Sequence, residues 1–140
     1  MNNRPTFITT SWDDGHILDL RVAQMLDKYG LTGTFYVPQH AEYGTMNTSQ
    51  IRQLSQHYEI GAHTIDHLAL TDLPEDQARQ QIVNSKAWVE QITGRACPMF
   101  CPPKGRFTKS HLAMVHDAGF PQCARLKCFR WIPQGVSITC

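Results

Sequence analysis

Two neighbouring carboxylates and a pair of histidines are the residues of this sequence best suited to chemistry. Asp13 and Asp14 stand side by side, and His63 and His67 are four residues apart. On a helical turn, residues four apart share one face, so both imidazoles could reach a single ion. Two histidines and one carboxylate, with open positions left, are typical of a catalytic metal site rather than a structural one. Either aspartate could supply the carboxylate.

The adjacent aspartates need an explanation, because like charges placed together are costly unless a positive charge lies nearby. A divalent cation would meet that need. One aspartate could then bind the metal, while the other acts as a base toward a metal-bound water. The alternatives are a solvated Asp-Gly turn or helix cap, and histidines that simply lie at the surface. Trp12, directly before the pair, argues against a simple exposed turn.

A third polar segment, Pro102-Pro103-Lys104-Gly105, combines two fixed φ angles with a freely rotating glycine. Such a segment is suited to presenting a backbone N–H rigidly toward a developing oxyanion. Many Pro-Gly loops only turn the chain, so this segment alone is weak evidence of function.

Short β-branched runs alternate with helical patterns along the chain. The predicted strands are Thr6–Thr10, Thr34–Val37, Glu59–Ala62, Pro98–Cys101 and Cys123–Leu126. The predicted helices begin at Leu18, at Thr48 or Ser49, at Asp72 and at Thr108, and three of them end near Gly30, Gly94 and Gly119. Residues 127–140 show no clear period.

This alternation predicts βαβ units, a mainly parallel sheet and right-handed crossovers. An open doubly wound sheet and part of a (β/α) barrel both fit. In either fold, ligands bind at the carboxyl ends of the strands. The three polar segments each follow a predicted strand, so we expect them to gather on one rim of the sheet.

The bulk properties exclude several classes of protein. The 140 residues predict a single domain, 1–140, and the net charge of +1 gives no footprint for nucleic acid or an anionic membrane. No apolar stretch approaches the roughly 18 residues of a membrane span, and no signal-type segment opens the chain, so we expect a cytoplasmic protein. The odd count of five cysteines, without a CxxC pair, predicts mostly buried thiols rather than disulfides or a thiolate zinc site.

In order and separation, Asp13-Asp14-Gly15, His63-x-x-x-His67 and Pro102-Pro103-Lys104-Gly105 resemble the first three motifs of the polysaccharide deacetylases, carbohydrate esterase family 4. Gly33–Val37 and Glu59–His63 are also similar to segments of that family, and the resemblance covers roughly residues 6–125.

The resemblance implies a distorted (β/α) barrel, here incomplete with about five βα units. It implies a metal-dependent hydrolase that removes N-acetyl or O-acetyl groups from an amino-sugar polymer or oligomer. Asp14, His63 and His67 would bind the metal, most often Zn²⁺ and otherwise Co²⁺ or Ni²⁺. Asp13 would be the general base, and the backbone N–H of Lys104 would help to hold the oxyanion.

The sequence departs from the family in two places. The third motif usually begins with an arginine that pairs with the base, and here Cys101 occupies that position, with Lys104 and Arg106 as candidate substitutes. The later general-acid histidine of the family has no match after Gly119, because His111 and His116 fall in a predicted helix, where we expect them to face solvent.

We therefore expect a C-terminally truncated deacetylase that binds metal but releases little or no acetate, since loss of a general acid–base group costs about 10²–10⁴ in rate. Its unfinished sheet edge would favour self-association.

Three other readings compete with this one. The first is a catalytically impaired metal- or carbohydrate-binding remnant of the same fold. The second is an unrelated open α/β binding module, although no P-loop or dinucleotide fingerprint supports it. The third is an enzyme with Cys101 as nucleophile, for which the sequence offers no assignable histidine partner.

Overall fold

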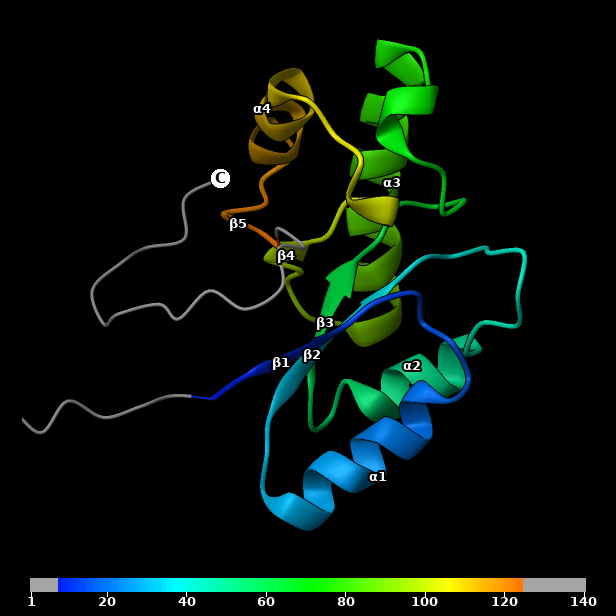
Figure 1. Ribbon diagram of the computed structural model, residues 1–140, viewed down its shortest axis with the longest axis vertical. Helices are drawn as coiled ribbons and strands as arrows, with labels where there is room; N and C mark the ends of the chain where they lie inside the picture. The colour runs from blue at the N-terminus through cyan, green and yellow to red at the C-terminus, as the bar shows by residue number, and fades with distance from the viewer. Residues whose placement is uncertain (1–7, 125–140) are drawn as a thin grey trace, which may run out of the picture.

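The computed structural model describes residues 8–124, which fold into five strands, four α-helices and two 3₁₀ turns (Figure 1). The strands are β1 (Thr10–Trp12), β2 (Gly33–Val37), β3 (Glu59–Ala62), β4 (Met99–Phe100) and β5 (Gln122–Cys123). The helices are α1 (Asp19–Tyr29), α2 (Thr48–Leu54), α3 (Glu75–Thr93) and α4 (Lys109–Asp117), with 3₁₀ turns η1 (Leu70–Asp72) and η2 (Pro103–Gly105).

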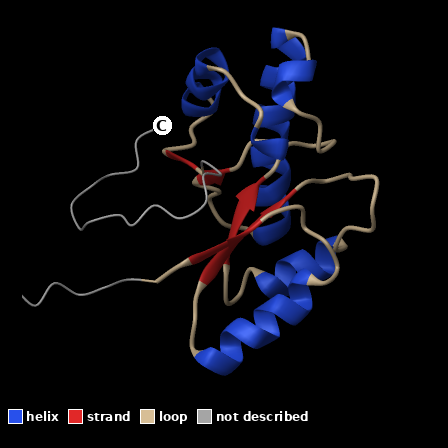
Figure 2. Ribbon diagram, in the orientation of Figure 1, coloured by secondary structure: helices blue, strands red, loops and turns tan. Residues whose placement is uncertain are grey.

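The five strands form one parallel sheet in the order β1-β2-β3-β4-β5 (Figure 2). Each strand therefore pairs with the strand that precedes or follows it in the sequence. A doubly wound sheet reverses its strand order at a switch point, whereas a (β/α) barrel winds continuously in one direction. The observed order decides between the two predicted architectures in favour of part of a barrel, bounded in the described residues by β1 and β5.

The core lies between the sheet and the helices packed on it. Its fully buried side chains come from both layers, with Phe35, Val37 and Phe100 from the strands and Ile51, Ile82, Val89, Met114 and Val115 from the helices. Burial of each such side chain stabilises the fold by about 1.5–3 kcal/mol. The same core fixes the register of the strands, and this register determines where the polar residues that follow the strands lie.

The predicted strands match the structure best in the middle of the sheet. Glu59–Ala62 is confirmed, and the second strand is confirmed with Gly33 added at its start. The first strand runs from Thr10 to Trp12 instead of ending at Thr10. Residues 6, 7 and 125–140 lie outside the described part, so only the start of the last predicted strand can be compared.

Two helix starts were predicted wrongly. The cap of α2 is Asn47 rather than Thr48 or Ser49, because the Asn47 side chain accepts the N–H of Gln50 in a capping box. Asp72 does not cap α3, which begins after Pro74. The Thr108 cap and the left-handed stops at Gly30 and Gly94 are confirmed.

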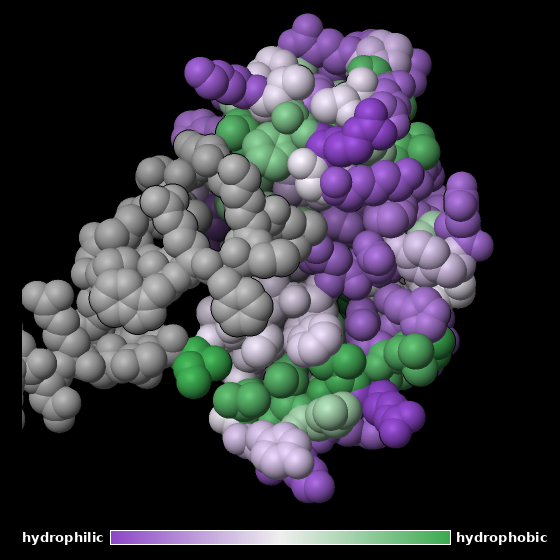
Figure 3. Space-filling model, in the orientation of Figure 1, coloured by the Kyte–Doolittle hydropathy of each residue, from purple (hydrophilic) through white to green (hydrophobic). Residues whose placement is uncertain are grey.

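The apolar positions of α1 are divided between the core and the surface. Ala23 and Leu26 are buried, whereas Leu18, Met25 and Tyr29 are more than half exposed. Figure 3 shows the resulting apolar band in the lower part of the view, over α1. No helix in the described residues is long and apolar enough to cross a membrane.

Gly61 is a position where the fold leaves no room for a side chain. It pairs with Tyr36 across β2 and β3, and a Cβ at Gly61 would lie 2.4 Å from Cδ1 of the buried Tyr36 ring. Gly44 has no atom within 4 Å of the equivalent position.

We therefore expect Gly61→Ala to lower the free energy of unfolding by about 1–3 kcal/mol, the usual cost of overpacking a core. Gly44→Ala, the matched control, should leave it nearly unchanged. Urea unfolding followed by circular dichroism measures both, and equal midpoints for the two variants would contradict the packing described here.

Asp19, the first residue of α1, is a buried carboxylic acid. Its side chain is 7% exposed, and Oδ2 has no hydrogen-bond partner among the described residues. Burial, followed by the charges of Asp14 and Asp13, raises the pKa of Asp19 from 3.8 to about 7. Between these two pH values the folded chain holds a proton that the unfolded chain releases, so its stability falls as the pH rises.

Asp19→Asn should remove this pH dependence, because an amide does not ionise. We expect the variant to match the wild type in free energy of unfolding near pH 4 and to exceed it near pH 8. The measurement is urea unfolding at both pH values with EDTA present, so that no cation neutralises the neighbouring carboxylates. If the wild type has the higher free energy of unfolding at pH 8, the ionised Asp19 is stabilised by its surroundings in the fold, and the prediction is wrong.

Candidate active site

The structure brings Asp14, His63 and His67 together at the carboxyl ends of the strands. Oδ1 of Asp14 lies 3.4 Å from Nε2 of His63 and 3.0 Å from Nε2 of His67. The three candidate ligand atoms all lie within 4.8 Å of one another, and they form the one group of this kind in residues 8–124. Of the two aspartates that the sequence offered as the third ligand, the geometry favours Asp14.

Strand register explains why residues so far apart in sequence meet. Trp12 is paired with Phe35 on β2, and Val37, two residues further, is paired with Ala62 on β3. Two residues beyond Trp12, the chain reaches Asp14, which is therefore level with Ala62. The residue after Ala62 is His63. Parallel pairing through β2 thus delivers the carboxylate and the first imidazole to the same rim.

The spacing of the two histidines predicted a helical turn, and this prediction is wrong. His63 directly follows β3, and the chain then runs as an irregular loop, in which Thr64 has φ 64° and His67 has φ 52°. These left-handed residues fold the loop back, so the two imidazole ring centres lie 5.1 Å apart. The spacing therefore predicted that the two imidazoles lie together, which is confirmed, but the helical turn on which that prediction was based is absent from this loop.

Backbone strain is concentrated at this rim. In the described residues, the non-glycine residues with positive φ are Asp14, Thr64, His67 and Lys104. Such conformations cost of order 1–3 kcal/mol each and persist only where the surrounding structure imposes them, commonly at functional sites. Three of the four are residues for which the sequence predicted a site role.

The His63 imidazole is buried, with 1% of its surface exposed, and its orientation is fixed by the backbone. Its Nδ1 lies 2.7 Å from the carbonyl oxygen of Cys101. Since a carbonyl can only accept, Nδ1 carries the proton and donates it, which leaves the lone pair of a neutral ring on Nε2. This second contact is typical of metal-binding histidines.

The donor set fits a small divalent cation. Bonds of about 2.0–2.1 Å in a tetrahedral site separate neighbouring ligand atoms by about 3.3 Å, close to the distances from Oδ1 of Asp14 to the two imidazoles. Nε2 of His67 is buried and lacks a well-aligned hydrogen-bond partner among the described residues. The contact with His63, together with the charge of His67, holds the pKa of Asp14 below its usual value, so the carboxylate is ionised and available.

Asp13 lies beside this group but is not part of it. Its Oδ1 is buried without a hydrogen-bond partner in the described residues, and burial raises the pKa of Asp13 above its usual value. A carboxylate that is poorly solvated and unpaired at one oxygen is a competent proton acceptor.

Cys101 occupies the position where the family resemblance predicts arginine. Its Sγ lies 3.6 Å from Oδ2 of Asp13, so the thiol donates a weak hydrogen bond to that carboxylate in place of a salt bridge. Burial and the Asp13 charge raise the pKa of the Cys101 thiol far above its usual value. A thiol held protonated is a poor nucleophile, which argues against the reading of Cys101 as the reactive group.

Neither Arg106 nor Lys104, the two basic side chains near the third motif, contacts Asp13 in place of the family's arginine. Arg106 binds Asp72 instead, through two hydrogen bonds of 2.6 and 2.9 Å. Lys104 lies in η2 with an exposed side chain and φ 58°. The Arg106–Asp72 pair joins the loops after β3 and β4, and so ties the Lys104 segment to the rim.

His111 was expected to face solvent, and that prediction is wrong. Its side chain is buried because Nδ1 accepts the backbone N–H of Thr108 and completes the capping box of α4. His116, in contrast, is 83% exposed, as predicted. Both histidines are therefore accounted for without a general-acid role.

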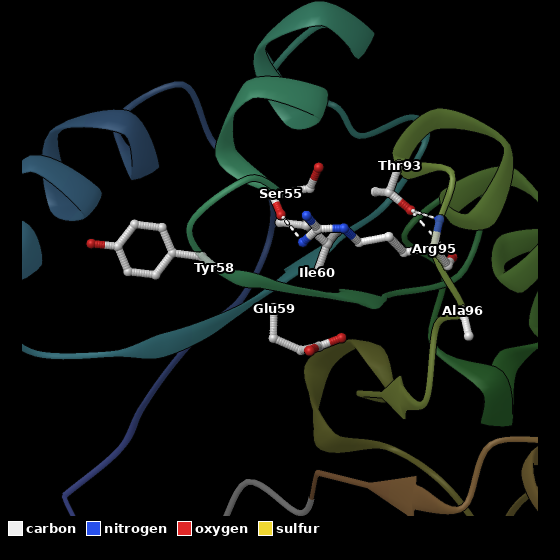
Figure 4. Close-up of a pocket in the computed structure, with 7 residues that line it drawn as sticks. All are labelled: Ser55, Tyr58, Glu59, Ile60, Thr93, Arg95 and Ala96. Carbon is white, nitrogen blue, oxygen red and sulfur yellow. Dashed lines mark hydrogen bonds between the residues drawn. The ribbon is translucent and has the colours of Figure 1, made fainter.

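A shallow hollow lies at the opposite end of the sheet (Figure 4). It is lined by Ser55, Tyr58, Glu59, Ile60, Thr93, Arg95 and Ala96. Glu59 is the first residue of β3, whereas His63 follows its last, so this hollow faces away from the rim. Arg95 crosses it and donates to the carbonyl oxygen of Ser55 at 2.6 Å, a contact that joins α2 to the end of α3.

Comparisons with known proteins agree on one family. The family model for polysaccharide deacetylase matches residues 1–123. The putative polysaccharide deacetylase YxkH of Bacillus subtilis (strain 168) is 25% identical over 117 residues, which are 81% of this chain and 42% of that protein. The peptidoglycan-N-acetylmuramic acid deacetylase PdaA of the same organism is 27% identical over 123 residues, 85% of this chain and 46% of that protein.

Solved structures show the same fold. The polysaccharide deacetylase BC0361 of Bacillus cereus aligns with a TM-score of 0.77 and 21% identity, covering 96% of this chain and 44% of that one. The chitin deacetylase of the fungal pathogen Colletotrichum lindemuthianum aligns with a TM-score of 0.71 and 18% identity, covering 83% and 54%. The chain thus spans less than half the length of the curated relatives it matches. Because the family model matches residues 1–123, most of the sequence, the chain belongs to the polysaccharide deacetylase family.

Proposed function

We propose that this chain forms the metal-binding part of a hydrolase that removes acetyl groups from an N-acetylated or O-acetylated amino-sugar polymer or oligomer. The observation that carries the proposal is the convergence of Asp14 Oδ1 on both imidazole Nε2 atoms. Relatives named as peptidoglycan deacetylases, and a structural neighbour named as a chitin deacetylase, support the substrate class.

In this proposal, Asp14, His63 and His67 hold a divalent cation, Zn²⁺ or otherwise Co²⁺ or Ni²⁺. When bound, the cation supplies Lewis-acid polarisation of the acetyl carbonyl and increases the acidity of water. Asp13 accepts the proton from the attacking water, a role that its raised pKa and its open Oδ1 favour. The backbone N–H of Lys104, held in a left-handed turn, would donate to the oxyanion.

A second candidate is a metal- and carbohydrate-binding remnant that hydrolyses slowly or not at all. The Cys101–Asp13 contact favours it, because a weak thiol donor replaces the guanidinium that the family uses to hold the base. Both candidates require a bound cation, and they differ in acetate release.

The metal centre can be tested without any substrate. We expect the metal-free chain to take up one equivalent of Co²⁺ or Zn²⁺ in isothermal titration calorimetry. His63→Ala and His67→Ala should each weaken binding by more than the roughly 10–100-fold that loss of an outer-shell partner costs. His116→Ala changes an exposed imidazole outside the site and is the matched control. Absence of stoichiometric uptake by the wild type would refute the centre.

Acetate release separates the two candidates. We expect slow release from N-acetylchitooligosaccharides by the Zn²⁺-loaded chain, and a further fall of about 10²-fold or more in Asp13→Asn, because an amide cannot accept the proton. Co²⁺ affinity of that variant should stay within about threefold of the wild type, because Asp13 is not one of the ligands. A Zn²⁺-loaded chain that binds the oligosaccharide and releases no acetate would favour the remnant.

A further inference from the structure

The segment between β2 and α2, residues 38–47, is fastened to both loops that carry the proposed metal ligands. Its contacts are the Met46 N–H to the Gly15 carbonyl at 2.9 Å, the antiparallel bridge between Thr45 and His16, and the His40 N–H to the Ile65 carbonyl at 2.7 Å. The segment therefore spans the rim from the loop after β1 to the loop after β3. Tyr43 lies between these anchoring points.

The Tyr43 side chain contacts His67, one of the three proposed ligands. Its hydroxyl oxygen is 3.3 Å from Nδ1 of His67, and the two rings meet edge to face with centres 5.6 Å apart. No role was assigned to Tyr43 from the sequence, because nothing in its spacing relates it to the motifs.

The direction of this hydrogen bond follows from the chemistry of the partners. An imidazole that binds a cation through Nε2 keeps its proton on Nδ1, so in the proposed centre Nδ1 of His67 donates and the Tyr43 hydroxyl oxygen accepts. A neutral imidazole protonated on Nδ1 has its lone pair on Nε2, the atom 3.0 Å from Oδ1 of Asp14.

His63 and His67 are thus oriented by different kinds of partner. The partner of His63 is the backbone carbonyl of Cys101, which no substitution removes, whereas the partner of His67 is a side chain. The His67 loop is irregular and the residue itself has φ 52°. Without a fixed partner on Nδ1, this imidazole can rotate or change tautomer and withdraw Nε2 from the site.

We propose that Tyr43 is a positioning residue of the metal centre, whose hydroxyl accepts Nδ1–H of His67 and holds the His67 tautomer that presents Nε2 to the cation. The inference rests on the proposed function, since it assumes that the three ligands share a cation. Tyr43 keeps the His67 imidazole in place before the cation arrives, so its hydroxyl raises metal affinity.

Tyr43→Phe removes the hydroxyl and retains the ring contacts with His67 and His16. Titration of the metal-free chain with Co²⁺ alone, followed by calorimetry and visible absorption, should show a Kd about 10–100-fold higher than that of the wild type, the usual cost of an outer-shell partner. Tyr29→Phe, on the exposed face of α1, is the matched control and should not change the Kd. A Tyr43→Phe variant that binds Co²⁺ as tightly as the wild type would overturn the proposal.

A second measurement reads the tautomer directly. Long-range ¹H–¹⁵N spectra of the metal-free wild type should show His67 protonated on Nδ1. In Tyr43→Phe this preference should be lost for His67 and kept for His63, a difference that a general loss of structure would not produce. A wild-type His67 protonated on Nε2 overturns the proposal even if Tyr43→Phe fails to fold. Failure of the wild type to take up Co²⁺ counts against the proposed function, and the spectra then still decide the tautomer.

Discussion

The site depends on holding three electron-rich atoms close together. When both imidazoles are unprotonated on Nε2, these atoms and Oδ1 of Asp14 each present a lone pair, and such atoms repel one another unless a positive charge lies between them. The distances from Oδ1 to the two Nε2 atoms are 3.4 Å for His63 and 3.0 Å for His67. The fold opposes this repulsion with rigid elements. Parallel pairing through β2 places Asp14 and His63 at the same height in the sheet. The Cys101 carbonyl orients the His63 imidazole, and the strained loop after β3 brings the His67 imidazole back toward it. In the proposed metal centre, a bound cation would relieve this repulsion.

The replacement of arginine by Cys101 changes the electrostatics of the neighbouring base rather than those of the ligands. A guanidinium beside Asp13 would favour its ionised form, whereas the buried thiol offers one weak hydrogen bond and burial dominates. The Cys101 carbonyl meanwhile still serves His63. In the proposed mechanism, metal binding and proton transfer are therefore separable, because Cys101 contacts the proposed base through its side chain and a proposed ligand through its backbone.

Sequence reasoning placed Asp14, His63 and His67 together because their types and their positions after strands are local information, and the structure brings these three side chains together. The roles of Asp13 and Lys104, taken from the family resemblance, stay predictions. The helical turn for His63 and His67 was wrong, because positive φ at Thr64 and His67 is imposed by tertiary contacts that spacing does not encode. The capping role of His111 and the diversion of Arg106 to Asp72 were missed for the same reason. Tyr43 was missed because its contacts join residues 24 or more positions apart.

The strictly sequential order of the strands bears on how the molecule is assembled. Each strand pairs with one adjacent in the sequence, so contacts form between units that leave the ribosome one after the other. All three proposed ligands, and Tyr43, lie within the first 67 residues, on or beside β1, β2 and β3. The proposed ligands therefore belong to the part of the sheet that is synthesised first, whereas the carbonyl that orients His63 follows with the fourth strand.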